Sequence, residues 1–375
     1  MLTQEEKERY SRQILIDSFT EVGQEKLKHA SVLVIGAGGL GCPALTYLAG
    51  AGIGHLGIVD PDIVELSNLH RQSLYCMDDI GMKKVKAASR RLQKINSGIY
   101  ISEFDTLLNQ KNAFEIINEF DVIIDGTDNF LARFIINDTC SILNKVWVYG
   151  SVYKFEGQVS VFNAPTAAGT PGPDYRSLFP DTLHQDAMAS CETIGTLGVI
   201  PGIVGMLQAT EAIKVICNYD GILSGKLLTF DALKMSFETF AIGIREFSED
   251  IKPTSKEGFL KKDYQLSCAS PNELVEELTP SELNRLINEQ DLLIIDIREA
   301  NESTPLEGIH AINHPWSALD EFRMSEVQNR TAVFICMQGN RSRMFIQALK
   351  MKGAQARLYS LRGGIEGWRK FKLHH

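Results

Sequence analysis

The pattern of apolar and polar positions along the chain predicts an α/β fold. Short runs of Val, Ile and Leu are typical of strands buried on both faces of a parallel sheet, and they alternate with stretches of helical apolar spacing. Later runs alternate apolar and polar residues, as strands in an antiparallel extension do. The predicted strands lie at 31–35, 57–60, 99–104, 120–125, 146–153, 156–162, 227–233 and 237–244, and the predicted helices at 3–28, 84–93 and 203–216.

A change of composition near residue 248 predicts a domain boundary. Residues 248–258 are polar and contain a proline and a glycine, which is typical of a linker. We expect a first domain at 1–247, a linker at 248–277 and a smaller α/β domain at 278–375. The second domain opens with a capping-box pattern, Thr279 followed by Glu282, and again alternates strand and helix patterns.

Composition narrows the classes of function. The 375 residues carry a net charge of -9, which argues against nucleic acid as the main partner. No apolar run approaches the roughly 18 residues that span a membrane, and the start is charged rather than signal-like. We therefore expect no membrane association and a cytoplasmic protein. The seven cysteines are scattered without a C-x-x-C pair, so we expect reduced thiols.

A glycine-rich turn after the first strand carries the first chemical signal. Gly36, Gly38 and Gly41 let the chain turn tightly and bring backbone N–H groups close to a phosphate, as in Rossmann-like sheets. Asp60 ends the second strand, where an acid can bind ribose hydroxyls. These four residues alone fit NAD, FAD and S-adenosylmethionine as well as ATP.

The polar residues after Asp60 favour a reaction at a triphosphate. Asn68, Arg71 and Gln72 lie in one short loop beside the expected phosphate position, and Lys84 follows them. A guanidinium and an ammonium group neutralise the negative charge that develops on phosphorus, whereas hydride transfer does not need them there. The ordinary ATPase loop, G-x-x-x-x-G-K-[ST], does not occur in the sequence.

Together these motifs resemble the MoeB/ThiF (HesA/MoeB/ThiF) family, bacterial relatives of ubiquitin-activating enzymes. The motifs begin at Gly36, Asp60, Ser67 and Thr127, in that order, within about the first two thirds of the chain. The resemblance implies adenylylation of the C-terminal glycine of a ubiquitin-like sulfur-carrier protein, with ATP and Mg²⁺. It assigns nucleotide binding to Gly36, Gly38, Gly39, Gly41, Asp60, Asn68, Gln72, Lys84, Asp128 and Asn129, and charge stabilisation to Arg12, Arg71 and Lys84.

The resemblance also implies a homodimer. Arg12 belongs to an Arg-Tyr-x-Arg-Gln-Ile element, which in the family reaches into the nucleotide site of the partner subunit, much as an arginine finger does. Periodicity alone makes the same stretch a surface helix that caps the domain.

The strand at 120–125 delivers further polar groups to the same edge of the sheet. Asp128 could coordinate Mg²⁺, which favours a carboxylate together with phosphate oxygens and water. Its alternative role is to cap the helix that begins near Phe130. Arg133, one turn along that helix, is a second candidate for phosphate contact, or else a solvated or structural charge.

Three further positions bear on how this chain compares with the family. Many family members bind structural zinc through two C-x-x-C pairs, but Asp174 and Ser177 stand at the first pair here, so we expect no structural zinc. Cys191 falls where the family places a cysteine on a mobile crossover loop, which takes up the acyl group or resolves an acyl disulfide. The alternative for Cys191 is a small buried residue.

The second domain has its own cysteine pattern. Cys336 ends a strand, and the loop from it to Arg341 can direct backbone N–H groups at the sulfur. With Asp296, Arg298 and the glycine motif before Trp368, this pattern resembles the rhodanese family, sulfurtransferases that carry a persulfide. Four residues separate Cys336 from Arg341, one fewer than in the dual-specificity phosphatases of the same fold, so the loop is sized for sulfur.

The two resemblances combine into one expected activity. The first domain would adenylylate a carrier of the molybdopterin-synthase type, and a Cys336 persulfide would convert the adenylate to a thiocarboxylate. Thiosulfate or a persulfide-bearing desulfurase would supply the sulfur. The thiamine-thiazole carrier, or a cysteine-biosynthetic or tRNA-thiolation carrier, remains an alternative substrate.

A chain with a glycine turn of this kind is also compatible with two other classes of function. One is an NAD(P)-dependent oxidoreductase with a rhodanese passenger, and Asn68, Arg71 and Lys84 speak against it. The other is a non-catalytic scaffold that docks partners, and the full set of adenylation motifs speaks against that.

Overall fold

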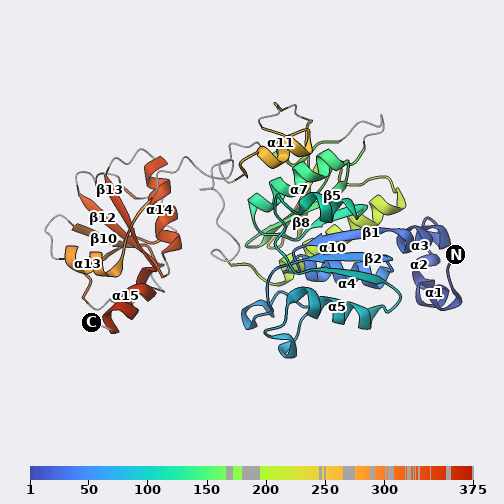
Figure 1. The fold of residues 1–375 in the computed structure, drawn as a ribbon, viewed down its shortest axis with the longest axis horizontal. Coiled ribbons are helices and arrows are strands. Elements are labelled where there is room, and N and C mark those ends of the chain that lie inside the picture. The colour runs from blue at the N-terminus through green and yellow to red at the C-terminus, as the bar shows by residue number, and fades with distance from the viewer. Residues whose placement is uncertain are drawn as a thin grey trace. The chain divides into compact units, whose positions relative to one another are not determined.

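The computed structural model of the chain consists of two compact units, the first ending and the second beginning near residue 268 (Figure 1). It describes residues 1–165, 172–179, 195–244, 247–248, 251–264, 275–287, 292–299, 302, 308–316, 318, 322–323, 325, 327, 330–337, 339–351 and 356–373.

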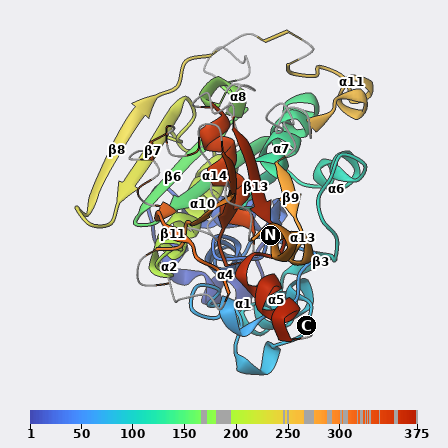
Figure 2. The same cartoon turned by 90° about the vertical axis from the view of Figure 1, so that its left-hand side faces the viewer.

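The first unit is built on an eight-stranded sheet with the order β3-β2-β1-β4-β5-β6-β7-β8. Neighbours from β3 to β5 pair in parallel and those from β5 to β8 pair antiparallel, so the mostly parallel sheet expected from the sequence is confirmed. Figure 2 shows β7 and β8 at the edge of the antiparallel extension. The strands are β1 (Ser31–Ile35), β2 (His55–Val59), β3 (Tyr100–Phe104), β4 (Val122–Asp125), β5 (Val146–Tyr153), β6 (Glu156–Phe162), β7 (Lys226–Asp231) and β8 (Ser236–Ala241).

This strand order places the candidate site. The chain leaves β1 toward β2 on one side and returns to β4 on the other, so the connections diverge between β1 and β4. Open parallel sheets bind ligands at the carboxyl ends of strands at such a switch point. The glycine turn after β1 and the Thr127 motif after β4 both lie there.

Helices cover both faces of the sheet. Alternate residues of β1 enter two different cores, Val32 and Val34 in one and Leu33 and Ile35 in the other, because strand side chains alternate between faces. Figure 1 shows α7 on one side of β1 and β2 and α4 and α5 on the other. The helices of this unit include α1 (Gln4–Arg9), α2 (Ser11–Ile14), α3 (Thr20–His29), α4 (Gly41–Ala51), α5 (Lys84–Ile95), α6 (Ala113–Asn118), α7 (Phe130–Leu143), α8 (Tyr175–Leu178), α10 (Val199–Cys217) and α11 (Lys256–Lys261).

The helix α10 corrects one expectation. Its 19 residues have a mean hydropathy of 1.4 in their most apolar window, which is long and apolar enough to span a membrane. In this fold α10 packs against α4, β5 and β6, and Val204 and Ala209 lie in the core. In the structure α10 is a helix of the first unit, and 44% of that apolar window is buried inside it.

The segment expected to be a linker at 248–277 is also corrected in its first half. Phe259 of α11 is fully buried in the core beside α7 and packs edge-on against Phe114, with ring centroids 5.0 Å apart. The Tyr264 hydroxyl donates to Asp138 at 2.8 Å. Residues 256–264 therefore belong to the first unit. The composition is misleading because a few long apolar side chains, widely spaced, anchor an otherwise polar stretch.

The second unit is a smaller α/β domain, as expected. Its parallel five-stranded sheet has the order β11-β10-β12-β13-β9, and apolar cores lie on both faces. Thr279 and Glu282 form the predicted capping box of the first helix. The elements are β9 (Glu276–Leu278), α13 (Pro280–Leu286), β10 (Leu292–Asp296), β11 (Ile312–Asn313), β12 (Thr331–Ile335), α14 (Asn340–Met351), β13 (Arg357–Leu361) and α15 (Gly364–Leu373).

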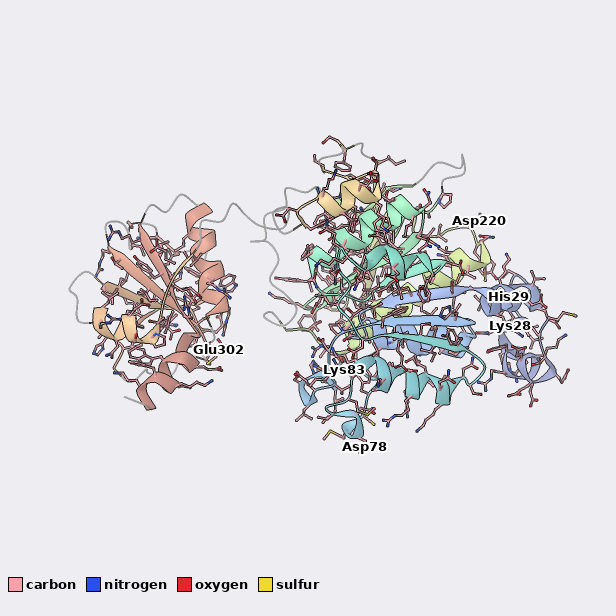
Figure 3. All side chains as sticks on the ribbon, in the orientation of Figure 1. Lys28, His29, Asp78, Lys83, Asp220 and Glu302 are labelled. Carbon is pink, nitrogen blue, oxygen red and sulfur yellow. The ribbon has the colours of Figure 1, made fainter. Side chains whose placement is uncertain are left out.

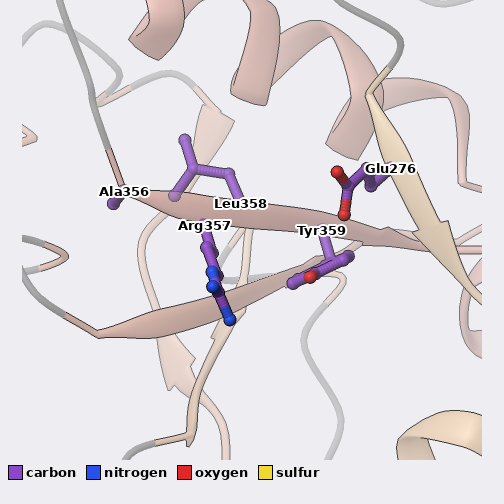
Figure 4. A pocket seen from close by; sticks show the side chains of 5 residues that line it. All are labelled: Glu276, Ala356, Arg357, Leu358 and Tyr359. Atoms are coloured by element: carbon purple, nitrogen blue, oxygen red, sulfur yellow. The ribbon is translucent and has the colours of Figure 1, made fainter.

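A pocket on this unit lies along β13 and the end of β9. Its lining contains none of the residues that the sequence assigns to chemistry (Figure 4). The pocket therefore plays no part in the candidate site.

Candidate active sites

The turn after β1 requires glycine for steric reasons. Gly36 has a φ of +94°, and a Cβ on it would lie 2.7 Å from the carbonyl oxygen of Gly126. A Cβ on Gly41 would lie 1.9 Å from the Gly36 carbonyl oxygen. The backbone can therefore close this turn only without side chains at these positions.

Asp60 holds the glycine turn from the neighbouring strand. Its Oδ2 accepts the backbone N–H of Ala37 at 2.8 Å, and its Oδ1 accepts that of Asp62 at 2.9 Å. Burial raises the pKa of the Asp60 carboxyl, and the nearby Lys84 ammonium opposes that rise. The acid thus fixes the phosphate-facing loop as well as standing at the expected ribose position.

Lys84, the predicted phosphate-neutralising cation, lies between two carboxylates. It begins α5, and its Nζ lies 2.8 Å from Asp62 Oδ2 and 3.9 Å from Asp60 Oδ1. Only 7% of the Lys84 side chain is exposed, so its charge is weakly screened by water. The structure places the Lys84 ammonium next to the Asp60 carboxylate.

The loop after β2 carries three further predicted residues, and two of them, Arg71 and Gln72, lie beside the glycine turn. Asn68 ends a short 3-10 turn (Leu66–Asn68), and its Oδ1 accepts the Glu65 N–H at 3.2 Å. A Cβ on Gly39 would lie 3.7 Å from Arg71 Cδ, and one on Gly38 would lie 3.8 Å from Gln72 Nε2.

Gln72 has the burial and the unsatisfied atom expected of a ligand-binding residue. It is 3% exposed, and its Oε1 has no hydrogen-bond partner among the described residues. An unpaired buried amide oxygen is costly, and a bound group that hydrogen-bonds the amide removes the cost. The Gln72 side chain, whose Nε2 lies next to Gly38, is therefore a candidate to hydrogen-bond a ligand at the turn.

The motif after β4 separates two roles that the sequence left open. Asn129 caps α7, because its Oδ1 accepts the Ala132 N–H at 2.8 Å. Asp128 is exposed and is not the cap. Its carboxylate therefore stays at the carboxyl edge of the sheet, where a cation held by phosphate oxygens would bind.

Arg133 is a structural charge and not a phosphate contact. It is 3% exposed, its Nε lies 3.0 Å from Asp125 Oδ2, and its Nη2 donates to the Gly150 carbonyl at 3.2 Å. Burial raises the pKa of Asp125, and Arg133 opposes that rise. Arg133 therefore stabilises the fold, because the buried carboxylate of Asp125 needs a positive charge beside it.

Two predicted residues are not brought to the site by the described chain. Arg12 lies on α2 with its side chain exposed, as the partner-subunit role requires, and nothing within this chain tests that role. Cys191 lies outside the described residues.

Tyr75 is a site residue that the sequence did not identify. Its buried hydroxyl donates to the Ala37 carbonyl at 2.8 Å, so the Ala37 peptide is held by Tyr75 on one side and Asp60 on the other. Burial raises the pKa of the Tyr75 hydroxyl, so the tyrosine remains a donor. In the sequence, the only sign of a role for Tyr75 was its position shortly after Gln72. A tyrosine at that position does not belong to a distinctive motif.

The cysteine of the second unit lies in a cradle of backbone N–H groups. Cys336 is 1% exposed, and its Sγ accepts the N–H groups of Gly339 at 3.1 Å and of Ser342 at 3.4 Å. Gly339 has a φ of +94°, which turns its N–H toward the sulfur. Such a cradle stabilises a thiolate or a persulfide anion, so this predicted arrangement is present.

Arg341 stands at the rim of the cradle. Its Nη1 lies 2.8 Å from Glu302 Oε2, and this arginine holds the pKa of the Glu302 carboxyl below its ordinary value. Figure 3 labels Glu302 at the surface of the second unit. Asp296 and Arg298, which the sequence singled out, form a buried ion pair at 2.8 Å that supports this rim, since Arg298 Nη1 donates to the Glu302 carbonyl at 3.1 Å.

The fold and these sites define the class: a nucleotide-binding α/β domain followed by an α/β domain with a sulfur-carrying cysteine. A ThiF family model matches residues 10–250, and a rhodanese-like domain model matches residues 279–371. The chain belongs to the ThiF family and carries a rhodanese-like domain.

Two of the curated relatives match nearly the whole of this chain. The chain is 38% identical, over 97% of its length and 93% of the relative, to a probable molybdopterin-synthase adenylyltransferase of Porphyra purpurea. It is 38% identical, over 98% of its length and 88% of the relative, to the adenylyltransferase and sulfurtransferase MOCS3 of Culex quinquefasciatus. A sulfur carrier protein adenylyltransferase of Thermus thermophilus is 45% identical over 64% of this chain and 89% of the relative.

Solved structures match the first unit. The crystal structure of PaaA is 27% identical with a TM-score of 0.55, and covers 64% of this chain and 75% of that chain. The structure of E. coli MccB with ATP has a TM-score of 0.55 at 24% identity, and covers 63% of this chain and 72% of that chain. The MccB likeness confirms the fold.

Proposed function

We propose that this chain uses ATP to adenylylate the C-terminal glycine of a ubiquitin-like sulfur-carrier protein and then transfers sulfur to it from Cys336. The observation that carries the proposal is the presence, in one chain, of a glycine turn braced by Asp60 beside Lys84 and of a thiol held by two backbone N–H groups. Relatives whose names state both activities, such as MOCS3, cover nearly the whole chain and support it.

The first step is attack of the carrier's terminal carboxylate on the α-phosphorus of ATP. The new oxygen–phosphorus bond forms as the bond to the bridging oxygen breaks, and pyrophosphate leaves. Arg71 and Lys84 neutralise the charge that develops, since fixed cations act most strongly where it accumulates. Asp60 would hold the ribose, and Asn68 and Gln72 would orient the phosphates.

The residues at the carboxyl edge of β4 fit a magnesium ion. Mg²⁺ binds through one or two carboxylates together with phosphate oxygens and water, and Asp128 offers an exposed carboxylate that does not cap α7. Asn129 caps that helix beside it. The ion would neutralise phosphate charge.

The second step uses the persulfide of Cys336. Its terminal sulfur attacks the acyl carbon of the adenylate, AMP leaves, and an acyl disulfide joins the carrier to Cys336. A second thiol, proposed to be Cys191, attacks Sγ of Cys336, so that the thiocarboxylate leaves with the electron pair of the broken S–S bond. The resulting disulfide returns to two thiols with two electrons from a cellular dithiol.

The donor chemistry is a simple sulfur exchange. The Cys336 thiolate attacks the outer sulfur of thiosulfate or of a persulfide on a desulfurase, and sulfite or the donor thiolate leaves.

We further propose a cytoplasmic homodimer in which Arg12 completes the nucleotide site of the partner subunit.

The decisive experiment is intact-mass analysis of candidate carriers after incubation with the protein, MgATP and a sulfur donor. The carriers are those of molybdopterin synthesis and of thiazole synthesis, tested with wild type and with Cys336→Ala. We expect replacement of one carboxylate oxygen by sulfur, dependent on ATP and on Cys336. Cys76→Ala, which removes an exposed thiol outside the cradle, serves as the control and should behave as wild type.

Each outcome of this experiment tests a different part of the proposal. Pyrophosphate release without the mass change would leave an adenylating enzyme and remove the sulfur step. Neither signal with any carrier would refute the proposal. If only the carrier of thiazole synthesis is converted, that carrier, and not the molybdopterin-type carrier, is the substrate.

A further inference from the structure

The loop before α8 and the segment after β8 carry residues that do not fit the structural zinc implied by the family resemblance. Zinc is bound in proteins by cysteine, histidine and carboxylate groups, and a lysine ammonium has no lone pair to offer. Asp174 and Ser177 stand at the first C-x-x-C pair, and Lys252 and Ser255 have the same spacing in the later segment. Three of these four residues cannot replace a thiolate.

Three of the four positions are nevertheless in direct contact. Asp174 Oδ2 lies 2.6 Å from Lys252 Nζ, with 4% of the Asp174 side chain exposed. The other oxygen, Oδ1, accepts the Ser177 N–H at 2.9 Å and its hydroxyl at 3.0 Å. A carboxylate therefore occupies the centre and joins two segments that are distant in sequence.

A second buried pair joins Arg176 to Asp138 of α7. Arg176, between Asp174 and Ser177, donates to both oxygens of Asp138, at 2.8 and 2.6 Å, and both side chains are fully buried. Tyr264 from the later segment donates to the same Asp138 at 2.8 Å. The loop and the segment at 251–264 are thus fastened to α7 and to each other.

We infer that these five residues, Asp138, Asp174, Arg176, Lys252 and Tyr264, form a metal-free clamp that takes the place of a structural zinc in this chain. Closing the long loop between the two segments has an entropic cost, which either a metal or a buried ion pair can offset. The two buried carboxylates tolerate burial because each faces a cation and accepts further hydrogen bonds, Asp174 from Ser177 and Asp138 from Asn137 and Tyr264.

The first test uses the full chain. Metal analysis of the purified protein should find no bound zinc, and a chelator should leave the melting temperature unchanged. Lys252→Met should lower the melting temperature by about 5–10 °C, because it leaves Asp174 buried without its cation. Lys261→Met, an exposed lysine of α11, is the control and should change it by about 1 °C at most.

Stoichiometric zinc in the wild type, or equal melting temperatures for the two lysine variants, would overturn the inference. A second variant tests the position of the clamp independently. In the quadruple variant Asp174→Cys, Ser177→Cys, Lys252→Cys, Ser255→Cys, four thiols at C-x-x-C spacing replace the clamp residues Asp174 and Lys252 together with Ser177 and Ser255. We expect this variant to bind about one zinc per chain and to become sensitive to chelators. A folded variant without zinc would show that the clamp does not occupy a zinc position.

Discussion

The carboxylate of Asp60 holds the backbone N–H of Ala37 at 2.8 Å, so an acid at the end of one strand fixes the glycine turn after its neighbour. Asp60→Asn keeps the shape but removes the charge, and turns one acceptor into a donor that faces an N–H group. We expect the KM for ATP to rise roughly tenfold or more, since a hydrogen bond to a charged group contributes about 1.5–3 kcal/mol. Pyrophosphate exchange measures this value.

Asp62→Asn provides the comparison for Asp60. Asp62 is 61% exposed and contacts Lys84, but its side chain does not hold the turn. We expect a smaller rise in KM for this variant. Equal effects of the two variants would mean that the loss of charge near Lys84, and not the bracing of the turn, controls ATP binding.

Lys84 and Lys83 form a matched pair of neighbouring cations. Lys84 is nearly buried beside Asp60. Lys83, which Figure 3 labels, is 42% exposed and pairs with Asp105 at 3.0 Å. We expect Lys84→Met to lower the rate of adenylate formation by ~100- to 1000-fold, because the lost cation faces the developing charge. Lys83→Met should change that rate less than about threefold. Comparable losses in both variants would contradict the assigned role of Lys84.

Arg12 provides a test of the homodimer through complementation. If Arg12 acts in the partner's site, Arg12→Ala and Lys84→Met are each inactive alone, but a mixed dimer contains one complete site. Equal mixing after subunit exchange should restore about a quarter of wild-type pyrophosphate exchange, because half of the dimers are mixed and each has one working site. No recovery, with exchange verified by mass, would exclude the role in trans.

His55 predicts a pH dependence of stability. Its Nε2 lies 2.9 Å from Ser102 Oγ, and burial lowers its pKa below the ordinary 6.5, against the opposing effect of Glu119 and Asp121. The unfolded chain therefore binds the proton more readily, and stability falls as the pH drops below about 6.5. Denaturant unfolding between about pH 7.5 and 5.5 should show this loss in wild type and a smaller loss in His55→Gln. Identical slopes would remove His55 as the cause.

The glycine turn and the sulfur cradle could be predicted because their chemistry is local. Gly36 and Gly41 are required by a turn of a few residues, and the loop after Cys336 presents its own N–H groups to the sulfur. Local spacing of this kind is visible in the sequence. Arg133 was harder to place, since one turn along a helix it could have faced either phosphate or Asp125.

The sequence by itself determined the two α/β domains, the order of the motifs and the identity of the reactive groups, because strand periodicity, glycine turns and cysteine loops act over short distances. Tertiary structure decided which charged groups serve the fold. Tyr264 meets Asp138 across 126 residues, and that contact makes part of the expected linker a component of the first unit. Such pairs depend on how buried charges find partners once the sheet and helices are packed, and no local pattern encodes that choice.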